Sequence, residues 1–373
     1  ICSGMIGIAL CGGKNSRSHK NVVAESSSRI YDIYTIRQGV PKPGSSCTGV
    51  HKESGILREV SARAKKDANA IKKEIHAMRA LDSHPHIITL FDVFEDSKSV
   101  YLVTEPCDGG GLVDSIPRPG GFSEAKAAFL LKQLFCAVRY IHSRSFVHRN
   151  LHLGSLNLKA KGPVGGNSVL KVGSFELVCA FQPDVPLTAV CGPVGYMAPE
   201  VSDQEYNSPC DVWSCGVLSF MFLCGQLPFE GSSKEEIARE SNRGAFSFHP
   251  REWASVSELA KDLVRALLRR KPSQRWSAAE ALRHRWFREA VRSLESNDLP
   301  ETAGPVATSK GLLDLELDSA PQVDRDIFIP IQVNRCLKPT LLTGSPGDAV
   351  HRPAGPCANS DEIEPWGHPR VQL

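Results

Sequence analysis

The sequence His148-Arg149-Asn150-Leu151 follows a segment in which apolar residues recur at the spacing of a helix. Ser123 is a suitable N-cap for this segment, and the residues after it predict a long helix with one broad buried face. Further helical patterns follow, and they cover 211–223, 234–240, 257–268 and 277–287. The chain from Phe122 onward is therefore predicted to be mainly helical.

The chain before this long helix has a different hydrophobic pattern. One helical segment at about 67–81 stands among short β-like runs at 30–36, 89–94 and 99–104. A small β-rich part followed by a larger helical part predicts an α+β protein with two lobes. The expected parts are a flexible leader at 1–29, a small lobe at 30–105, a large lobe at 106–287, and a largely disordered tail at 288–373.

The composition is that of an ordinary soluble globular protein, with 41% hydrophobic and 23% charged residues among 373. A formal charge of only +3 gives no basic field for nucleic acid, so no nucleic-acid partner is expected. The twelve cysteines have no metal-site spacing and favour a reducing compartment, so we expect a cytoplasmic protein. No apolar run approaches the roughly 20 residues of a spanning helix, so no transmembrane segment is expected.

Several short motifs follow one another in the order and at the spacing of a eukaryotic protein kinase. They are His148–Leu151, Ala198–Glu200, Asp211–Val217, Gly225–Phe229, and Arg275 ahead of Ala281–Phe287. The phrases at 84–87, 94–96 and 121–125 resemble those of calcium/calmodulin-dependent and calcium-dependent protein kinases. The resemblance covers about 30–287 and implies the two-lobed protein-kinase fold, with ATP and Mg²⁺ as the cofactors of active members.

Structural residues of that family are present in this chain. The resemblance implies that Glu200 pairs with Arg275 and that Asp211 binds backbone amides of the catalytic loop. It also implies that His148 and Phe175 pack into the hydrophobic spine of the fold. All these roles need only a folded large lobe, so they do not require an active enzyme.

The loop that should hold the phosphates is altered. It runs from Gly39 to Gly44, and both of these glycines remain. Pro41 replaces the central glycine, and Pro43 removes a further N–H donor. We therefore expect this loop to bind phosphate poorly.

The lysine that should contact the α- and β-phosphates is also missing. Counted from the preceding turn, its position falls on Ser61. Its glutamate partner, Glu74, is present and is expected to have lost its ion pair. Lys65 or Lys66 could substitute from a shifted position, although a solvated basic cluster is the favoured interpretation.

A pocket for a purine could persist between the lobes. Thr104 stands at the gatekeeper position and Glu105 begins the hinge. Because the phosphate-binding groups are altered, ATP binding is expected to be weak.

The catalytic loop lacks the groups that transfer a proton and hold a metal. Asn150 stands where the family has the catalytic aspartate, and an amide is not a usable base near neutral pH. His152 replaces a lysine and Ser155 replaces the metal-binding asparagine, while Asn157 comes two residues too late to replace it. His152 could act as a substitute base, but a solvated loop histidine is favoured.

The metal-binding Asp-Phe-Gly motif has become Ser174-Phe175-Glu176. Serine is a weak ligand for Mg²⁺, which prefers charged oxygen. Glu176 could supply that oxygen, but we expect its side chain to point to solvent or to a basic neighbour. With Pro193 in place of a threonine of the same cluster, Mg²⁺ binding is not expected.

Two functions are compatible with these changes. The first is a catalytically impaired kinase domain, a pseudokinase, which acts as a scaffold or regulator in phosphorylation signalling. Arg149 keeps a phosphate-facing arginine for that role, and Thr188 is a candidate modification site, although an ordinary exposed threonine is favoured. The second is an active ATP-dependent Ser/Thr kinase whose displaced groups are Glu176, His152 or Lys65.

The expected partners are proteins, for example a kinase or its substrate. Calmodulin is an alternative partner, because arginines and apolar residues alternate over 282–292 as in a basic amphipathic helix. In the family this stretch is the last packed helix of the large lobe, and that favours packing over calmodulin binding.

Overall fold

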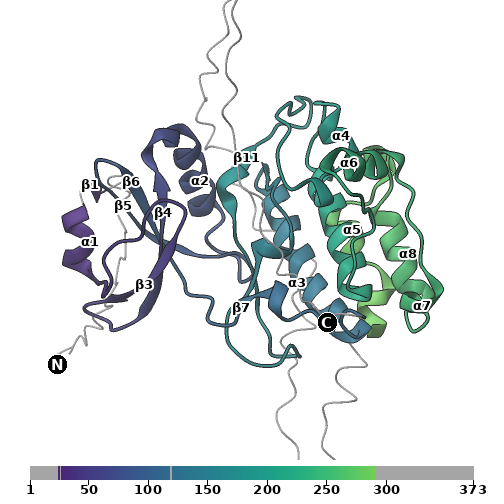
Figure 1. Ribbon diagram of the computed structural model, residues 1–373, viewed down its shortest axis with the longest axis horizontal. Coiled ribbons are helices and arrows are strands. Elements are labelled where there is room, and N and C mark those ends of the chain that lie inside the picture. The colour runs from purple at the N-terminus through teal and green to yellow at the C-terminus, as the bar shows by residue number, and fades with distance from the viewer. Residues whose placement is uncertain (1–23, 26, 118–119, 291–373) are drawn as a thin grey trace, which may run out of the picture. The chain divides into compact units, whose positions relative to one another are not determined.

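The computed structural model describes residues 24–25, 27–117 and 120–290 of the chain (Figure 1). Its contacts divide the chain into two units, 1–304 and 305–373, and the second unit lies wholly outside the described residues. Nearly all of the predicted tail and most of the predicted leader also lie outside them.

A six-stranded sheet forms the small lobe, in the order β1-β5-β6-β4-β3-β2. All neighbouring strands pair antiparallel except β1, which runs parallel to β5 at one edge. The bounds are β1 Ala24–Glu25, β2 Tyr34–Thr35, β3 Ser46–His51, β4 Leu57–Ala64, β5 Leu90–Glu95 and β6 Ser99–Thr104.

Alternation along β4 gives the sheet two different faces. Val60 and Ala62 are fully buried, and they pack in one apolar cluster with Ile30 of helix α1 (Ser27–Ile33). Ser61 and Arg63 point to the opposite face because successive side chains of a strand alternate. Helix α2 (Ala68–Ala80) lies on the side of that second face, after the 3₁₀ turn η1 (Lys65–Asp67).

The predicted strand at 30–36 is confirmed only at Tyr34–Thr35 (β2), because residues 30–33 belong to helix α1. Ile30 and Tyr34 are buried, whereas the three residues between them are exposed. This spacing of four residues belongs to one face of a helix. Residues 24–25 and 27–29 of the predicted flexible leader belong to β1 and α1, and the rest of it lies outside the described residues. The predicted helix at 67–81 and the strands at 89–94 and 99–104 are confirmed as α2, β5 and β6.

The large lobe is mainly helical and is built around α3 (Glu124–Ser143) and α5 (Pro209–Cys224). Every residue of α5 after Pro209 is buried, and α3 contacts both α5 and α9 (Ala278–Leu282). The other helices are α4 Pro199–Ser202, α6 Lys234–Arg243, α7 Pro250–Trp253 and α8 Glu258–Leu267. The two-lobed α+β architecture is therefore confirmed.

Short strands and 3₁₀ turns position the loops between the two lobes. The strands are β7 Gly110–Gly111, β8 Phe146–Val147, β9 Leu156–Leu158, β10 Leu170–Val172 and β11 Cys179–Ala180. The 3₁₀ turns are η2 Leu112–Asp114, η3 Leu153–Ser155, η4 Phe175–Leu177, η5 Val194–Tyr196 and η6 Pro272–Gln274. Strands β7, β9 and β10 form one small sheet, and β8 pairs with β11.

The stretch considered as a calmodulin target packs into the core of the large lobe. Trp286 and Phe287 are only 1% and 2% exposed, and the ring of Phe287 lies 5.9 Å from that of Phe135 in α3. Calmodulin could reach these side chains only if they left the core, so the packing argues against this partner. Residues 291 and 292 of the stretch lie outside the described residues. No helix in the described ranges is long and apolar enough to cross a membrane.

Candidate active site

A buried ion pair fixes the segment that precedes α5. Both Arg275 and Glu200 are 6% exposed, and they form two hydrogen bonds: Nη1 to Oε1 at 2.5 Å and Nη2 to Oε2 at 3.0 Å. The guanidinium also lies over the ring of Trp213, 5.1 Å from its centroid. A bidentate pair of this kind gives geometric specificity as well as energy. The predicted pairing of Glu200 with Arg275 is confirmed.

Asp211 holds the catalytic loop by its backbone, as predicted. Its carboxylate accepts hydrogen bonds from the backbone N–H of His148 and of Arg149, each at 2.8 Å, and contacts His142 Nε2 at 2.9 Å. Burial opposes ionisation of Asp211, but the hydrogen bond and charge of His142 outweigh it, so its pKa lies below its ordinary value. The rings of His148 and Phe175 are 4.9 Å apart and fully buried, which confirms their predicted packing.

A cleft of about 180 Å³ lies between the sheet and the large lobe. Its lining comes from β4, α2, β9 and the segment 173–176, and Thr104 contributes to it as predicted. This volume is below the roughly 300–1,000 Å³ that is typical of ligand pockets. Gly39 and Gly44 do not line it.

Several backbone N–H groups of the loop from Gly39 to Gly44 donate hydrogen bonds to other residues of the small lobe. Gly39 donates to Ile36 O at 3.5 Å, and Val40 donates to the hydroxyl of Tyr31 in α1 at 3.1 Å. Gly44 donates to Ala62 O at 3.0 Å. Pro41 and Pro43 have no N–H, so little donor capacity remains for a phosphate. The sequence pattern did not predict the contact from Tyr31.

Glu74 keeps an ion pair, which corrects the sequence analysis. Arg63 donates to it from Nη2 at 2.9 Å and from Nε at 3.3 Å (Oε1 and Oε2, respectively). Ser61 does line the cleft, but the cation stands two residues later on the same face of β4. Burial raises the pKa of Glu74, and the charge of Arg63 opposes this shift. Lys65 does not pair with Glu74. Its Nζ instead contacts Asp96 O at 3.1 Å and a carboxylate oxygen of Glu95 at 3.3 Å.

Asn150 and Glu176 form a direct contact at the catalytic loop. The buried amide of Asn150 donates from Nδ2 to Oε1 of Glu176 at 3.2 Å and to Ser174 O at 3.4 Å. Glu176 is exposed, as expected, but its partner is a neutral amide and not the expected basic neighbour. Ser174 adopts a left-handed backbone conformation with φ of +62° and ψ of +55°.

The other two altered loop residues hydrogen-bond to each other. The hydroxyl of Ser155 donates to His152 O at 2.7 Å and accepts from His152 N at 3.1 Å. His152 Nδ1 accepts from Gly154 N at 3.1 Å, and burial lowers the pKa of the imidazole. Asn157, unlike Ser155, lines the cleft. His152 and Ser155 therefore shape the turn η3, and neither lines the cleft.

The sequence of this chain matches a known protein family. The protein kinase domain family matches residues 51–287. The chain belongs to this family. It is 34% identical to calcium-dependent protein kinase 5 of Plasmodium falciparum (isolate 3D7) over 73% of this chain and 47% of that protein. It is 36% identical to calcium-dependent protein kinase 3 of Plasmodium berghei (strain Anka) over 73% of this chain and 50% of that protein.

A plant relative shows the same extent of similarity. The chain is 34% identical to calcium-dependent protein kinase 19 of Arabidopsis thaliana over 69% of this chain and 46% of that protein. The chain thus spans about half the length of the curated relatives it matches. These similarities support a kinase domain of the calcium-dependent kinase type.

The side chain of the hinge residue Glu105 is bound by the backbone of Thr89 and by Lys171. Glu105 Oε1 accepts from Thr89 N at 2.9 Å and from the buried Lys171 Nζ at 2.7 Å. The side chain of Glu105 therefore ties the hinge to β10 and does not line the cleft. Lys171 also donates to Ile87 O at 3.3 Å.

A kinase domain in general uses ATP and Mg²⁺, and the charged side chains of this cleft can be compared with those of a nucleotide. Three carboxylates, those of Glu59, Glu74 and Glu176, line it against the single guanidinium of Arg63, which is already paired. A triphosphate would meet net negative charge there. Within the described ranges, no group of three or more His, Cys, Asp or Glu side chains could hold a metal ion.

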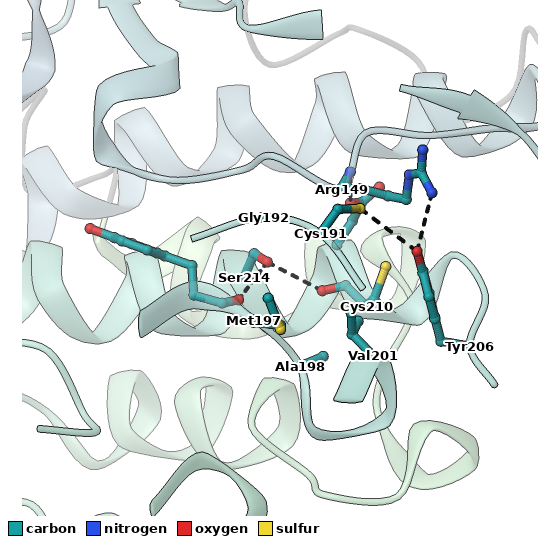
Figure 2. A pocket seen from close by; sticks show the side chains of 11 residues that line it. Arg149, Cys191, Gly192, Met197, Ala198, Val201, Tyr206, Cys210 and Ser214 are labelled. Atoms are coloured by element: carbon teal, nitrogen blue, oxygen red, sulfur yellow. Dashed lines mark hydrogen bonds between the residues drawn. The ribbon is translucent and has the colours of Figure 1, made fainter. Parts of the chain in front are cut away.

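Arg149 lies on the other side of the catalytic loop, where Figure 2 shows its side chain beside Tyr206. Its Nε donates to Leu177 O at 2.8 Å and its Nη1 donates to the Tyr206 hydroxyl at 3.2 Å. Within the described ranges, this guanidinium forms no ion pair with a carboxylate. The phosphate-facing role predicted for Arg149 remains a prediction.

Proposed function

We propose that this chain is a catalytically impaired protein kinase domain that acts as a scaffold or regulator in phosphorylation signalling. The observation that supports it most is the hydrogen bond from Asn150 Nδ2 to Glu176 Oε1 at 3.2 Å. The amide cannot take the proton of an acceptor hydroxyl, and its donor group is directed to the residue that replaces the glycine of the metal-binding motif. Loss of general-base catalysis costs on the order of 10²- to 10⁴-fold in rate.

The cleft supports the same proposal by its charge and its size. Its unpaired charges are negative, and the glycine loop retains few N–H groups for a phosphate. Without the positive charges and metal that stabilise phosphoryl transfer, the transition state would gain little from this site. We extend the proposal to weak or absent ATP and Mg²⁺ binding, protein partners such as a kinase or its substrate, and a cytoplasmic location.

The alternative is an active Ser/Thr kinase with displaced groups. Two observations favour it: the Arg63–Glu74 ion pair joins β4 to α2, and the carboxylate of Glu176 stands beside Asn150. Because Lys65 pairs with Glu95, it is no longer a candidate. Glu176 and His152 are the groups that this alternative would need.

A phosphorylation assay on the full chain separates the two functions. The chain would be incubated with ATP and Mg²⁺ or Mn²⁺ and an array of Ser/Thr peptides, beside the variants Glu176→Gln and His152→Gln. We expect no transfer above that of a heat-denatured sample. Transfer that either variant abolishes would refute the impaired-domain proposal and establish the alternative.

A thermal-shift titration tests nucleotide binding independently. A ligand that binds only the folded state stabilises it by mass action and so raises the melting temperature. At a ligand concentration of 100 times the Kd, the free energy of unfolding increases by about 2.7 kcal/mol. We expect no shift with millimolar ATP, with or without the metal ions. A shift that depends on the metal would show that the cleft still binds the nucleotide complex.

A further inference from the structure

A second cavity lies in the large lobe. Its volume is about 190 Å³, and none of the residues that line it also lines the cleft between the lobes. Three segments form it: the C-terminal part of α5, the loop 226–230 that follows, and the stretch from 247 to the end of α7. Because this cavity is smaller than the roughly 300–1,000 Å³ of pockets for drug-sized ligands, it suits a single side chain of a partner protein.

The floor of this cavity is aromatic. Phe220 of α5 and Trp253 of α7 line it and are only 4% and 2% exposed, so their rings lie at its base. The two ring centroids are 4.7 Å apart, and the ring of Phe248 packs 4.4 Å from that of Trp253. The same cluster already holds one cation, because the guanidinium of Arg265 lies 4.9 Å over the ring of Phe248. Aromatic rings of this kind attract a guanidinium group to their faces.

Two carboxylates, those of Glu230 and Glu252, line the same cavity. Among the described residues, no Lys or Arg lines it, and neither carboxylate has an ion-pair partner. The other titratable side chain of the lining is His249, whose Nε2 contacts Ser247 Oγ at 3.3 Å. Burial raises the pKa of the Cys224 thiol to about 11, and the charges of Glu252 and Glu230 contribute to this shift, so both carboxylates lie near one sulfur. The cavity therefore combines an aromatic floor with unpaired negative charge.

We propose that this cavity is a docking site for one arginine side chain of a protein partner. The guanidinium would stack on the aromatic floor, and its N–H groups would donate to the carboxylates of Glu230 and Glu252. A planar group with five N–H donors fits an aromatic face and two acceptors better than the compact ammonium of lysine does. The inference goes beyond the proposed function, because the cavity is separate from the cleft and would serve an active kinase equally well.

A titration with labelled peptides tests the site on the full chain. The probe is the blocked peptide Gly-Arg-Gly with ¹⁵N in its arginine side chain, and NMR would follow these signals as the chain is added. We expect shifts and broadening that fit a Kd on the order of 1 mM, because one side chain supplies the contact. The same peptide with citrulline, a neutral isostere of arginine, should bind about tenfold more weakly or less. Equal binding of the two peptides, or no detectable binding of the arginine peptide, would overturn the proposal.

Two double variants show whether the cavity is responsible for the binding. Glu230→Gln with Glu252→Gln should weaken binding of the arginine peptide roughly tenfold, because two partly exposed ion pairs are lost. The control, Asp203→Asn with Glu205→Gln, removes the same charge at exposed carboxylates outside the cavity and should leave the Kd unchanged. All four carboxylates are exposed or half-buried, so both variants should fold. An equal loss in both would show that the peptide responds only to net charge, and it would refute the site.

Two further measurements test the occupant. A blocked Gly-Lys-Gly peptide should bind more weakly than the arginine peptide, and equal binding would refute the selectivity for arginine. Sedimentation of the parent chain and of the Glu230→Gln/Glu252→Gln variant should give the same molecular mass. A dimer of the parent chain that this variant dissociates would assign the cavity to a second copy of the chain and would overturn the proposal.

Discussion

Replacement of Asn150 by aspartate restores the residue type of active kinases, yet we expect it to destabilise this chain. The aspartate would place a second carboxylate about 3.2 Å from Oε1 of Glu176, where the amide now donates. At that distance two unit charges repel by ~5 kcal/mol with an effective dielectric constant of 20. Because Glu176 is exposed, solvent screens most of this repulsion, and we expect ~1 kcal/mol of it to remain.

The lost hydrogen bond adds to that repulsion. A hydrogen bond from an amide to a charged oxygen is worth about 1.5–3 kcal/mol when buried, and the exposed carboxylate reduces it to about 1 kcal/mol here. The expected loss is therefore about 2 kcal/mol at pH 7. For a folded body of this size, that corresponds to a decrease in melting temperature of about 4–8 °C.

Urea denaturation of four proteins would measure this coupling: the parent chain, Asn150→Asp, Glu176→Gln and the double variant. Glu176→Gln alone should change stability by less than about 0.5 kcal/mol, since its amide oxygen still accepts from Asn150. The double variant should recover at least half of the loss, because the repulsion is gone. If Asn150→Asp is as stable as the parent chain, the contact between residues 150 and 176 does not have the energy assigned to it.

Three further changes test other contacts of the structure. Arg275→Met leaves Glu200 buried without its partner and should lower the free energy of unfolding, measured with urea, by about 3–5 kcal/mol. The control Arg243→Met removes an exposed pair with Glu240 and should lower it by less than about 0.5 kcal/mol. Equal effects of the two variants would contradict the energetic difference expected from burial. Arg63→Met should cost about 1–2 kcal/mol after allowance for its partial exposure, and Glu74→Met added to it should restore stability, which a melting series would show. Burial, with a smaller contribution from nearby cationic groups, lowers the pKa of His84 to about 4. The folded chain therefore resists protonation of His84 and loses stability as the pH falls from about 6.5 towards 4. In His84→Phe this loss of stability, measured between pH 7 and 4, should be smaller, and a pH profile equal to that of the parent chain would refute the contribution of His84.

The sequence predicted the parts of the site that several neighbouring residues determine together. Asp211, Glu200 and Arg275 stand in long motifs, and the structure brings each to its expected partner. The helical pattern of 67–81 likewise placed Glu74 on α2. These features depend on local periodicity and on motifs, which a single sequence displays.

The sequence-based predictions failed where two neighbouring positions could serve the same role equally well, or where a short pattern fitted both a strand and a helix. Ser61 and Arg63 lie on the same face of β4, and counting from a turn cannot tell which of them α2 will meet. The alternation of β4 was the available signal, because it offers the cation at 63 as readily as the hydroxyl at 61. At 30–36 the β-branched and aromatic residues suggested a strand, but burial of Ile30 and Tyr34 follows the period of a helix. Long-range partners such as Tyr31 with Val40 and Lys171 with Glu105 leave no local pattern.

Helix α1 also determines where a recombinant fragment of this kinase domain should begin. The family match starts at residue 51, but Ile30 of α1 is fully buried against Val60 and Ala62 of the sheet. A fragment cut at the family boundary would expose that apolar face to water and remove β2 and most of β3, which would leave β4 as an open edge. Exposed edges and apolar faces promote aggregation, so expression trials should start upstream of Ala24, where β1 begins.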